Sequence, residues 1–198
     1  MVKIDAKLIQ ELRNRTGLGM MDCKKALETT NGDIDKAVDE LRKKGANVAA
    51  KRSDKETQEG LVYAYIHPGD QVGVMLELNC ETDFVARNEA VKQFAKDVAM
   101  HIAAMKPRYL SLEDVDQAFL EHEKEIAHAQ MANSGKPANM LAQIIDAKVK
   151  KTCSELCLLS QPFVKSDKQT VQEILQDLIA KTGENIKIKR FARYEIGA

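Results

Sequence analysis

The spacing of apolar residues changes abruptly near residue 60, and this change constrains the fold more than any other feature of the chain. Before it, apolar side chains recur at three- and four-residue intervals that glycines interrupt. After it, residues 60–67 and 72–79 are rich in β-branched and aromatic residues and flank a turn-forming Pro-Gly-Asp-Gln sequence. Helices followed by a β-hairpin indicate an α+β fold.

Residues 1–55 are predicted to form a bundle of three short helices. Asp5 and Asp33 are candidate N-caps of the first and third helices, because an Asp side chain can accept from the free N–H groups of a helix start. A glycine is expected just beyond each helix, at Gly17, Gly32 and Gly45. Residues 46–55 are rich in Ala and charge, and they predict a helical linker.

Residues 56–198 predict a larger second domain. Helical periodicity returns over 88–105 and again over 170–182. Residues 186–196 alternate as a strand, which would complete a three-stranded antiparallel sheet with the hairpin. The expected apolar face of that strand comprises Ile186, Ile188, Ala192, Tyr194 and Ile196. Residues 158–165 are expected to form a loop.

An antiparallel helical hairpin that projects from the body is predicted at about residues 111–155. Ser111 and Asp114 resemble a capping box at its start. Its first helix shows a narrow apolar seam at Val115, Phe119, His122, Ile126 and Ala129. A turn is expected at 133–137, with Pro137 at the first position of the second helix.

The charge balance disfavours a direct nucleic-acid role. Lys and Arg total 30 and Asp and Glu also total 30, so the formal net charge is zero. Nucleic-acid binders usually carry a basic excess, because phosphate neutralisation supplies most of their affinity. The basic run Lys187, Lys189, Arg190 and Arg193 is interpreted as a solvated strand face. The first residues lack the apolar run of a signal peptide, and no stretch approaches the length of a membrane span, so the expected location is cytoplasmic.

No catalytic or metal-binding motif is evident. The chain has no glycine-rich phosphate loop and no recognisable nucleophile motif, so we expect no enzymatic activity. The four cysteines lack the paired spacing of a zinc site and are expected to be thiols: Cys23, Cys80, Cys153 and Cys157. We therefore expect neither a cofactor nor a bound metal.

Residues 80–88, which read CETDFVARN, join the second strand to the next helix and allow two interpretations. In the first, favoured by the pattern alone, Thr82 or Asp83 caps the helix while Phe84 and Val85 enter the core. In the second, Asp83 and Phe84 present a carboxylate and an apolar wedge to a partner, because such corners often carry function.

The start of the second helix carries a similar ambiguity. Met20 and Met21 are adjacent and cannot both face one core, so at least one is expected at the surface. Methionine adapts well to protein interfaces, although packing between the first two helices is the simpler interpretation.

These segments, in this order, resemble the bacterial elongation factor Ts family, the nucleotide exchange factors of elongation factor Tu. The similar stretches span essentially the whole chain: LIQELRNRTGLGMMDCKKAL (8–27), NGDIDKAV (31–38), LNCETDFVAR (78–87), MHIAAMKP (100–107), SGKP (134–137), QPFVK (161–165) and RFARYEIG (190–197).

The resemblance implies a role for each candidate residue. The three-helix domain would be similar to ubiquitin-associated domains and would dock on the GTPase domain of Tu. The implied Tu-binding positions are Arg13, Met20, Met21, Lys24 and His67. The segment implied to dislodge Mg²⁺ from the nucleotide site of Tu comprises Thr82, Asp83, Phe84 and Val85.

Long members of the family carry two copies of the core subdomain, and this chain carries one. The resemblance therefore implies the short form, which would dimerise through its sheet and bind Tu as a 2:2 complex. The alternative function is a ubiquitin-associated-like adaptor or a ribosome-associated chaperone without exchange activity. The segment at 82–87 separates these hypotheses, because an adaptor has no need of it.

Overall fold

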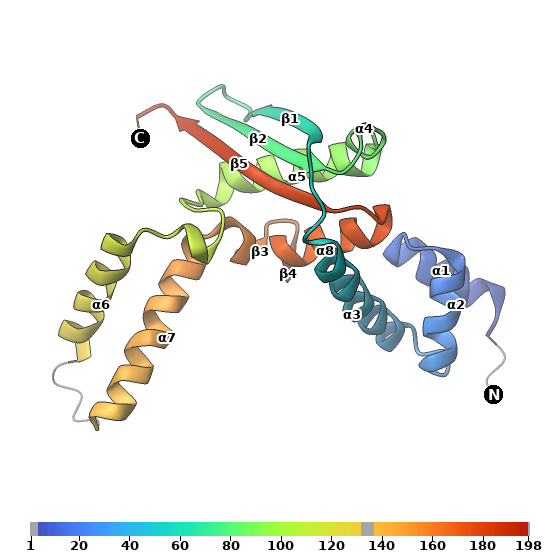
Figure 1. The fold of residues 1–198 in the computed structure, drawn as a ribbon, viewed down its shortest axis with the longest axis horizontal. Coiled ribbons are helices and arrows are strands. Elements are labelled where there is room, and N and C mark those ends of the chain that lie inside the picture. The colour runs from blue at the N-terminus through green and yellow to red at the C-terminus, as the bar shows by residue number, and fades with distance from the viewer. Residues whose placement is uncertain (1–3, 132–136, 198) are drawn as a thin grey trace. The chain divides into compact units, whose positions relative to one another are not determined.

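The structure of the chain, a computed structural model, describes residues 4–131 and 137–197 and confirms the α+β class (Figure 1). Its three-stranded antiparallel sheet has the order β1–β2–β5. The strands are β1 (Glu59–Ile66), β2 (Val72–Cys80) and β5 (Ile186–Glu195). The hairpin and the third strand therefore form the sheet that the sequence predicts.

The folded chain divides into two compact units. The first comprises the residues up to Tyr63 together with Glu77–Lys96 and Glu173–Lys189. The second comprises Ala64–Leu76, Asp97–Gln172 and the residues from Arg190 onward. Compactness in the folded chain does not show which part folds alone, so the boundary at residue 55 stays a prediction.

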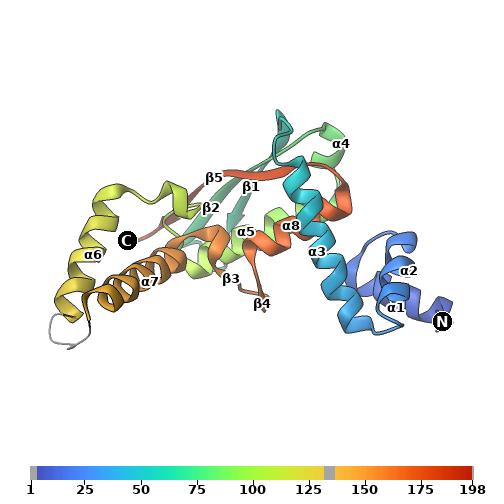
Figure 2. The same cartoon turned by 60° about the horizontal axis from the view of Figure 1, so that its bottom comes forward.

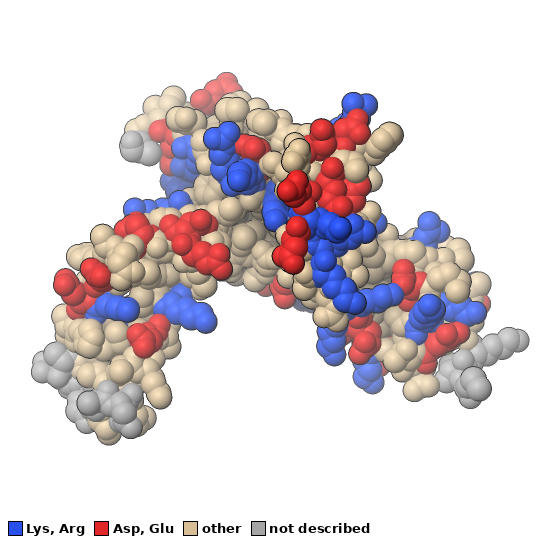
Figure 3. Space-filling model, viewed as in Figure 1, with Lys and Arg blue, Asp and Glu red and all other residues tan. Residues whose placement is uncertain are grey.

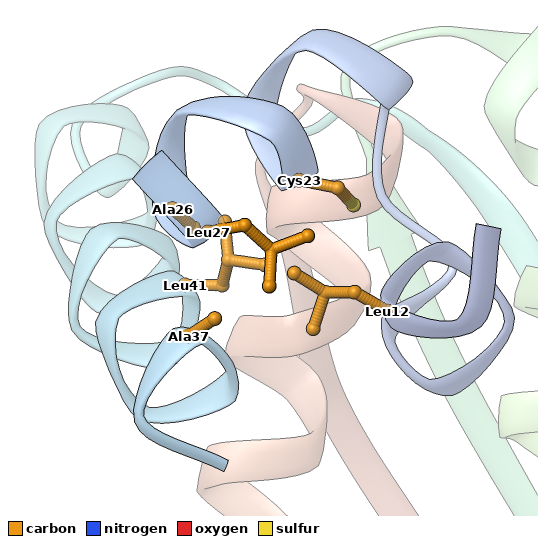
Figure 4. Packing of buried hydrophobic residues seen from close by; sticks show 6 residues of the cluster. All are labelled: Leu12, Cys23, Ala26, Leu27, Ala37 and Leu41. Carbon is orange, nitrogen blue, oxygen red and sulfur yellow. The ribbon is translucent and has the colours of Figure 1, made fainter. Parts of the chain in front are cut away.

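Three helices form a small apolar core in the first unit. They are α1 (Ala6–Thr16), α2 (Met20–Thr29) and α3 (Ile34–Arg52). Both predicted aspartate caps are present, since Asp5 accepts from the N–H of Lys7 and Asp33 accepts from the N–H of Lys36. The buried side chains that meet between the helices are Leu12, Cys23, Ala26, Leu27, Ala37 and Leu41 (Figure 4).

The predicted end of the third helix at Gly45 is wrong. Helix α3 continues to Arg52, so residues 46–52 belong to it instead of forming a separate linker. Gly45 is buried, and a Cβ atom there would lie 3.2 Å from the Cβ of Ala180 in α8 (Val171–Thr182). The glycine therefore allows two helices to approach closely, which offsets the helix-propensity penalty of glycine, about 0.5–1 kcal/mol relative to alanine.

The strand-to-helix connection contains a short additional helix. One turn, α4 (Asp83–Ala86), precedes the predicted long helix, α5 (Glu89–Met105). Most of the predicted stripe on α5 is buried, including Val91, Phe94 and Ile102. Met105 at its end is 44% exposed, so the stripe ends one turn before the helix does.

The alternation of β5 changes phase in mid-strand, which corrects two predictions. Ile186 and Ile188 are buried as expected, but Tyr194 and Ile196 are 70% and 75% exposed. Lys189 and Arg190 are consecutive exposed residues, so the inward face shifts from even to odd positions beyond them. The prediction that the basic run is a solvated strand face is therefore wrong for Arg193, whose guanidinium is largely buried. Its Nε and Nη2 donate to the Ala103 carbonyl at 3.3 and 3.2 Å.

The second unit contains the predicted helical hairpin. Helices α6 (Gln117–Met131) and α7 (Ala138–Leu156) lie side by side and antiparallel in both views (Figures 1 and 2). Pro137 occupies the position before the first residue of α7 and does not begin the helix, while residues 133–136 of the expected turn lie outside the described residues. The capping box at Ser111 and Asp114 is present, but it opens the 3-10 turn η1 (Leu112–Asp114), and Asp116 caps α6 instead.

The predicted apolar seam of this hairpin is confirmed at its start, where Val115 is buried and Phe119 packs against the buried hairpin residues, and wrong further along α6. His122, Ile126 and Ala129 are exposed, whereas Ala127 is buried. The inward face of the later turns of α6 is therefore shifted by one residue from the predicted one. The buried residues of the hairpin cluster are Val115, Ala127, Ile145, Val149, Cys153 and Cys157.

The predicted loop at 158–165 is also wrong in part. It contains the 3-10 turn η2 (Leu158–Ser160) and β3 (Pro162–Phe163), which pairs antiparallel with β4 (Ser166–Thr170). The buried His101 ring holds this region, since its Nδ1 accepts from the N–H of Val164 at 3.2 Å and its Nε2 lies 2.9 Å from Oε1 of Gln161. Among the described residues, no helix is both long and apolar enough to cross a membrane.

Candidate partner-binding site

The start of α4 is built around Thr82. Its side chain caps the helix, because Oγ1 accepts from the N–H of Val85 at 3.4 Å. Thr82 has extended backbone angles, φ −130° and ψ 156°, which turn the chain from the strand into the helix. The predicted cap is therefore present, and it fixes the direction of the four residues that follow.

Phe84 projects into solvent, which overturns the interpretation that it enters the core. Its exposed fraction is 83%, the largest of any large apolar residue in the described part of the protein. Ala86 is buried, and two steps of about 100° around a helix place Phe84 on the side opposite Ala86. An exposed phenylalanine forgoes the burial of a large apolar surface, so folding of this chain does not account for it.

Asp83 stays accessible beside Phe84. Its Oδ2 lies 3.0 Å from Nη2 of Arg87, one turn further along, and the Arg87 side chain is largely exposed while that of Asp83 is about half-exposed. An exposed ion pair of this kind contributes little to stability, typically between zero and 1 kcal/mol. The carboxylate is therefore held near Phe84 but can exchange Arg87 for another partner at small energetic cost.

A set of charged and polar side chains from distant segments holds the start of this helix. The Glu184 carboxylate accepts from the N–H of Thr82 at 3.1 Å and from its Oγ1 at 2.8 Å. The Glu81 carboxylate accepts from the N–H of Asn185 at 2.6 Å and from the Arg52 guanidinium. The sequence analysis missed Glu184, Glu81 and Arg52, because partners separated by 29 to 104 positions share no local pattern.

The candidate residues of the helical bundle are at the surface. Met20 and Met21 are 55% and 63% exposed, so both are solvent-accessible and neither packs between α1 and α2. Arg13 is exposed, and Lys24 is half-exposed and pairs with Glu28 at 3.8 Å. These residues and the Thr82–Val85 segment belong to the same compact unit.

Basic side chains gather along α3 on the face drawn in Figure 3, with acidic ones interspersed. Lys44 of α3 pairs with Asp22 of α2, and Arg52 pairs with Glu81. These pairs neutralise part of the basic charge of this helix.

His67 belongs to the second unit, where it follows β1 at the hairpin turn. Its ring is exposed, and Nδ1 lies 3.1 Å from the Tyr65 hydroxyl. The structure therefore groups four of the five implied docking positions with the Thr82–Val85 segment and assigns His67 to the other unit.

The outer face of the sheet carries exposed apolar side chains within the second unit. Ile66, Met75, Tyr194 and Ile196 are each at least half-exposed. They line a shallow hollow of about 490 Å³ together with Val72 and other residues of the three strands. An apolar surface of this kind is typical of an interaction site.

The described residues hold no cluster of three or more His, Cys, Asp or Glu side chains arranged for a metal ion. All four cysteines are buried free thiols. Burial raises the pKa of Cys80 and Cys153 and raises the pKa of Cys157 to about 11, so at neutral pH these three are protonated. A reactive thiolate or a thiolate metal site would need the opposite shift.

Comparisons with known proteins agree over nearly the whole chain. The family model described as "Elongation factor TS" matches residues 6–198. A protein of Caldanaerobacter subterraneus named Elongation factor Ts is 53% identical over 194 residues, covering 98% of this chain and 97% of that protein. Proteins with the same name from Carboxydothermus hydrogenoformans and Desulfitobacterium hafniense are 52% and 51% identical, covering 98% and 100% of this chain and 89% and 91% of their own length.

Proposed function

The chain belongs to the elongation factor Ts family, a family of translation elongation factors, and from this membership and the geometry of α4 we propose that it is a guanine nucleotide exchange factor for elongation factor Tu. It would bind Tu carrying GDP, promote the release of GDP and so allow GTP to reload in the cytoplasm during elongation. The observation that carries the proposal is the 83% exposed Phe84 on a helix turn whose start is held by charged hydrogen bonds.

The proposed mechanism acts on the metal site of the partner. Mg²⁺ that bridges phosphate and protein oxygens contributes to holding GDP, and it requires near-ideal octahedral geometry. Thr82 and Val85 would hold the Asp83–Phe84 pair as it enters that region, where Phe84 would displace neighbouring groups and Asp83 would repel the phosphates. Distortion of the metal site would weaken the binding of the nucleotide without any covalent step, so no catalytic residue and no cofactor is proposed for this chain.

Docking would be a separate task. The exposed surface at Met20 and Met21, with Arg13 and Lys24 beside it, would bind the GTPase domain of Tu, and His67 would add a contact from the second unit. Residues 1–55 would thus serve as the docking domain and residues 56–198 as the core. Flexible methionine side chains suit such a surface, because they adapt to a partner that changes conformation.

Thermodynamic linkage sets what this mechanism must achieve. If the exchange factor weakens GDP binding by a given factor, GDP must weaken the binding of the exchange factor by the same factor. Each 1.4 kcal/mol of coupling corresponds to about a tenfold change. If the association rate of GDP is unchanged, acceleration of its release by several orders of magnitude corresponds to a coupling energy larger than the ordinary allosteric range of about 1–3 kcal/mol.

Release of a fluorescent GDP analogue from Tu tests the proposal directly. The wild-type chain should accelerate release, and Phe84→Ala should abolish most of the acceleration. Leu112→Ala is the matched control, because Leu112 is an exposed apolar residue of η1 in the other compact unit. Binding to Tu without any acceleration by the wild-type chain would favour the alternative function, a ubiquitin-associated-like adaptor or ribosome-associated chaperone.

We further propose that the chain forms a homodimer through the outer face of its sheet, giving a 2:2 complex with Tu. Exposed apolar residues line that face, and a second copy would remove them from water. Sedimentation at micromolar concentration should show a dimer, and Tyr194→Glu should shift it toward the monomer. A single 22.1 kDa species for the wild-type chain would contradict the proposal.

A further inference from the structure

Three segments of the first unit meet at the start of α4. The first is the end of β2 with Glu81 and Thr82, and the second is the turn between α8 and β5 with Glu184 and Asn185. The third is the segment that follows α3, whose Ser53 and Lys55 carbonyls accept from the Asn185 side chain at 3.3 and 2.8 Å. Asn185 is 2% exposed, so this meeting point lies inside the unit.

The two turns brace each other through a reciprocal pair of carboxylates. Glu184 accepts from the backbone N–H of Thr82, and Glu81 accepts from the backbone N–H of Asn185. Each carboxylate also accepts from a side chain, Thr82 Oγ1 and the Arg52 guanidinium respectively. Hydrogen bonds to an ionised acceptor are shorter and about twice as strong as neutral ones, so this arrangement fixes both backbones.

Glu184 also controls the cap of α4. The Thr82 hydroxyl has one proton, and donating it to Glu184 turns an oxygen lone pair toward the N–H of Val85. The carboxylate therefore sets the orientation in which Thr82 caps the helix. It does so from outside the helix, because Glu184 lies in the turn between α8 and β5.

The conformation of α4 depends on this support. A helix of four residues is far below the length at which helices form by themselves in water. Phe84 contributes no burial that could hold the turn, because its side chain is in solvent. The turn is instead held by buried Ala86, by the Asp83–Arg87 ion pair and by hydrogen bonds at Thr82, and among these Glu184 supplies the hydrogen bonds to an ionised acceptor.

We propose that Glu184 is a positioning residue of the exchange site, which holds Thr82 and thereby orders the α4 turn that presents Asp83 and Phe84. This inference rests on the proposed exchange function. Without the Glu184 carboxylate, the chain would still dock on Tu, but the wedge would sample many directions. The α4 turn would then have to become ordered as Phe84 enters the nucleotide site of Tu, and this cost would slow exchange.

The test compares Glu184→Gln with the wild-type full-length chain. Glutamine keeps the size of the side chain, but its single carbonyl oxygen cannot accept from both donors of Thr82 through separate oxygens. We expect the maximal rate of GDP release at saturating exchange factor to fall about tenfold, the size of effect that loss of one charged hydrogen bond produces. The concentration that gives the half-maximal rate should change less than about twofold, because docking residues are untouched.

Amide hydrogen exchange of the unbound chain supplies a readout that needs no Tu. In Glu184→Gln, the amides of Thr82 and Val85 should exchange faster, while those of the α1–α3 bundle keep their protection. Ile188→Val is the matched control for a loss of stability, since it removes a buried methyl group from β5 and leaves both carboxylates in place. At a comparable fall in Tm, Ile188→Val should retain the wild-type maximal rate.

Substitutions of Thr82 keep the proposal testable if Glu184→Gln folds poorly. Thr82→Val should lower the maximal rate as Glu184→Gln does, whereas Thr82→Ser, which keeps the hydroxyl, should lower it less. The double variant Glu184→Gln/Thr82→Val should be no slower than the slower of Glu184→Gln and Thr82→Val alone. Both substitutions remove the same interaction, the hydrogen bond between Glu184 and the Thr82 hydroxyl.

Different outcomes overturn different claims. A wild-type maximal rate in Glu184→Gln, or an equal loss in Ile188→Val, would refute the positioning role and leave the exchange function standing. Unchanged amide exchange at Thr82 and Val85 in Glu184→Gln would also refute it. No acceleration of GDP release by the wild-type chain would refute the exchange function, and the inference with it.

Discussion

The α1–α3 bundle and the α4 turn both present exposed apolar side chains, but they are held in different ways. The bundle positions Met20 and Met21 over a core of buried aliphatic side chains, among them Leu12 and Leu27. The α4 turn positions Phe84 through hydrogen bonds to Thr82. Burial of apolar side chains stabilises a fold but depends little on the orientation of the groups. Charged hydrogen bonds fix the orientation of the groups that they join but add only modest net stability. A docking surface needs the stability that burial supplies, whereas a wedge needs the fixed orientation that charged hydrogen bonds supply.

Leu27→Ala should give the largest loss of stability, because Leu27 is fully buried at the centre of the bundle. Truncation of a buried leucine to alanine costs about 2–5 kcal/mol through lost transfer free energy and the cavity that remains. Urea unfolding should show this loss, and binding to Tu should weaken in parallel as the bundle opens. A loss below about 1 kcal/mol would mean that the bundle does not depend on its apolar core.

The buried imidazole of His101 should give the protein a pH-dependent component of stability. Burial lowers the pKa of His101 from its ordinary value of 6.5, so the folded chain favours the neutral ring. The unfolded chain binds the proton more readily, and this stabilising contribution is therefore present above pH 6.5 and lost as the pH falls through the lowered pKa.

Urea unfolding midpoints between pH 7.5 and about 5 measure this component. His101→Gln should reduce the fall in stability with decreasing pH, because it removes the buried imidazole. An identical pH dependence in wild-type and His101→Gln chains would exclude the buried imidazole as its source.

Thr82→Ala should cost about 1 kcal/mol, because it removes the α4 cap and a donor to Glu184. Thr29→Ala is the matched control, since the Thr29 hydroxyl only donates to the Lys25 carbonyl on the exposed surface of α2. The control should change the free energy of unfolding by less than about 0.5 kcal/mol. Equal effects of the two substitutions would mean that the polar support of α4 contributes nothing beyond an ordinary surface hydroxyl.

Sequence reasoning succeeded where the determining interactions are local. The Asp5 and Asp33 caps depend on residues two or three positions away, and both are present. It failed at Gly45, which was predicted to end the third helix. Only the contact with Ala180 reveals that this glycine lets α3 and α8 approach closely. The same limit applies to Phe84, whose exposure depends on which side of α4 the buried Ala86 takes.

The support of the candidate site was beyond prediction for the same reason. Glu184 and Thr82 are separated by 102 residues, and the sequence around Glu184 gives it no distinguishing pattern. The phase change in β5 arises from two consecutive exposed residues, Lys189 and Arg190, within a run that otherwise alternates. Pattern rules assume a constant register along a strand, so they placed Tyr194 on the wrong face.

Phe84→Ala should have the smallest effect on stability and one of the largest on exchange. A core phenylalanine would cost about 3–5 kcal/mol on truncation, but the 83% exposed Phe84 should change the free energy of unfolding by less than about 0.5 kcal/mol. GDP release from Tu at saturating concentration should nevertheless slow by more than about tenfold, because the apolar wedge is gone.

Asp83→Ala sharpens this result, since Asp83 lies on the same helix turn as Phe84. Added to Phe84→Ala, it should slow release by less than it does alone, because neighbouring residues that act on one element are not additive. A large fall in Tm together with unimpaired exchange would identify Phe84 as a stabilising residue and would remove the wedge from the mechanism. The difference between the two regions would then disappear, because α4 would be held by burial as the bundle is.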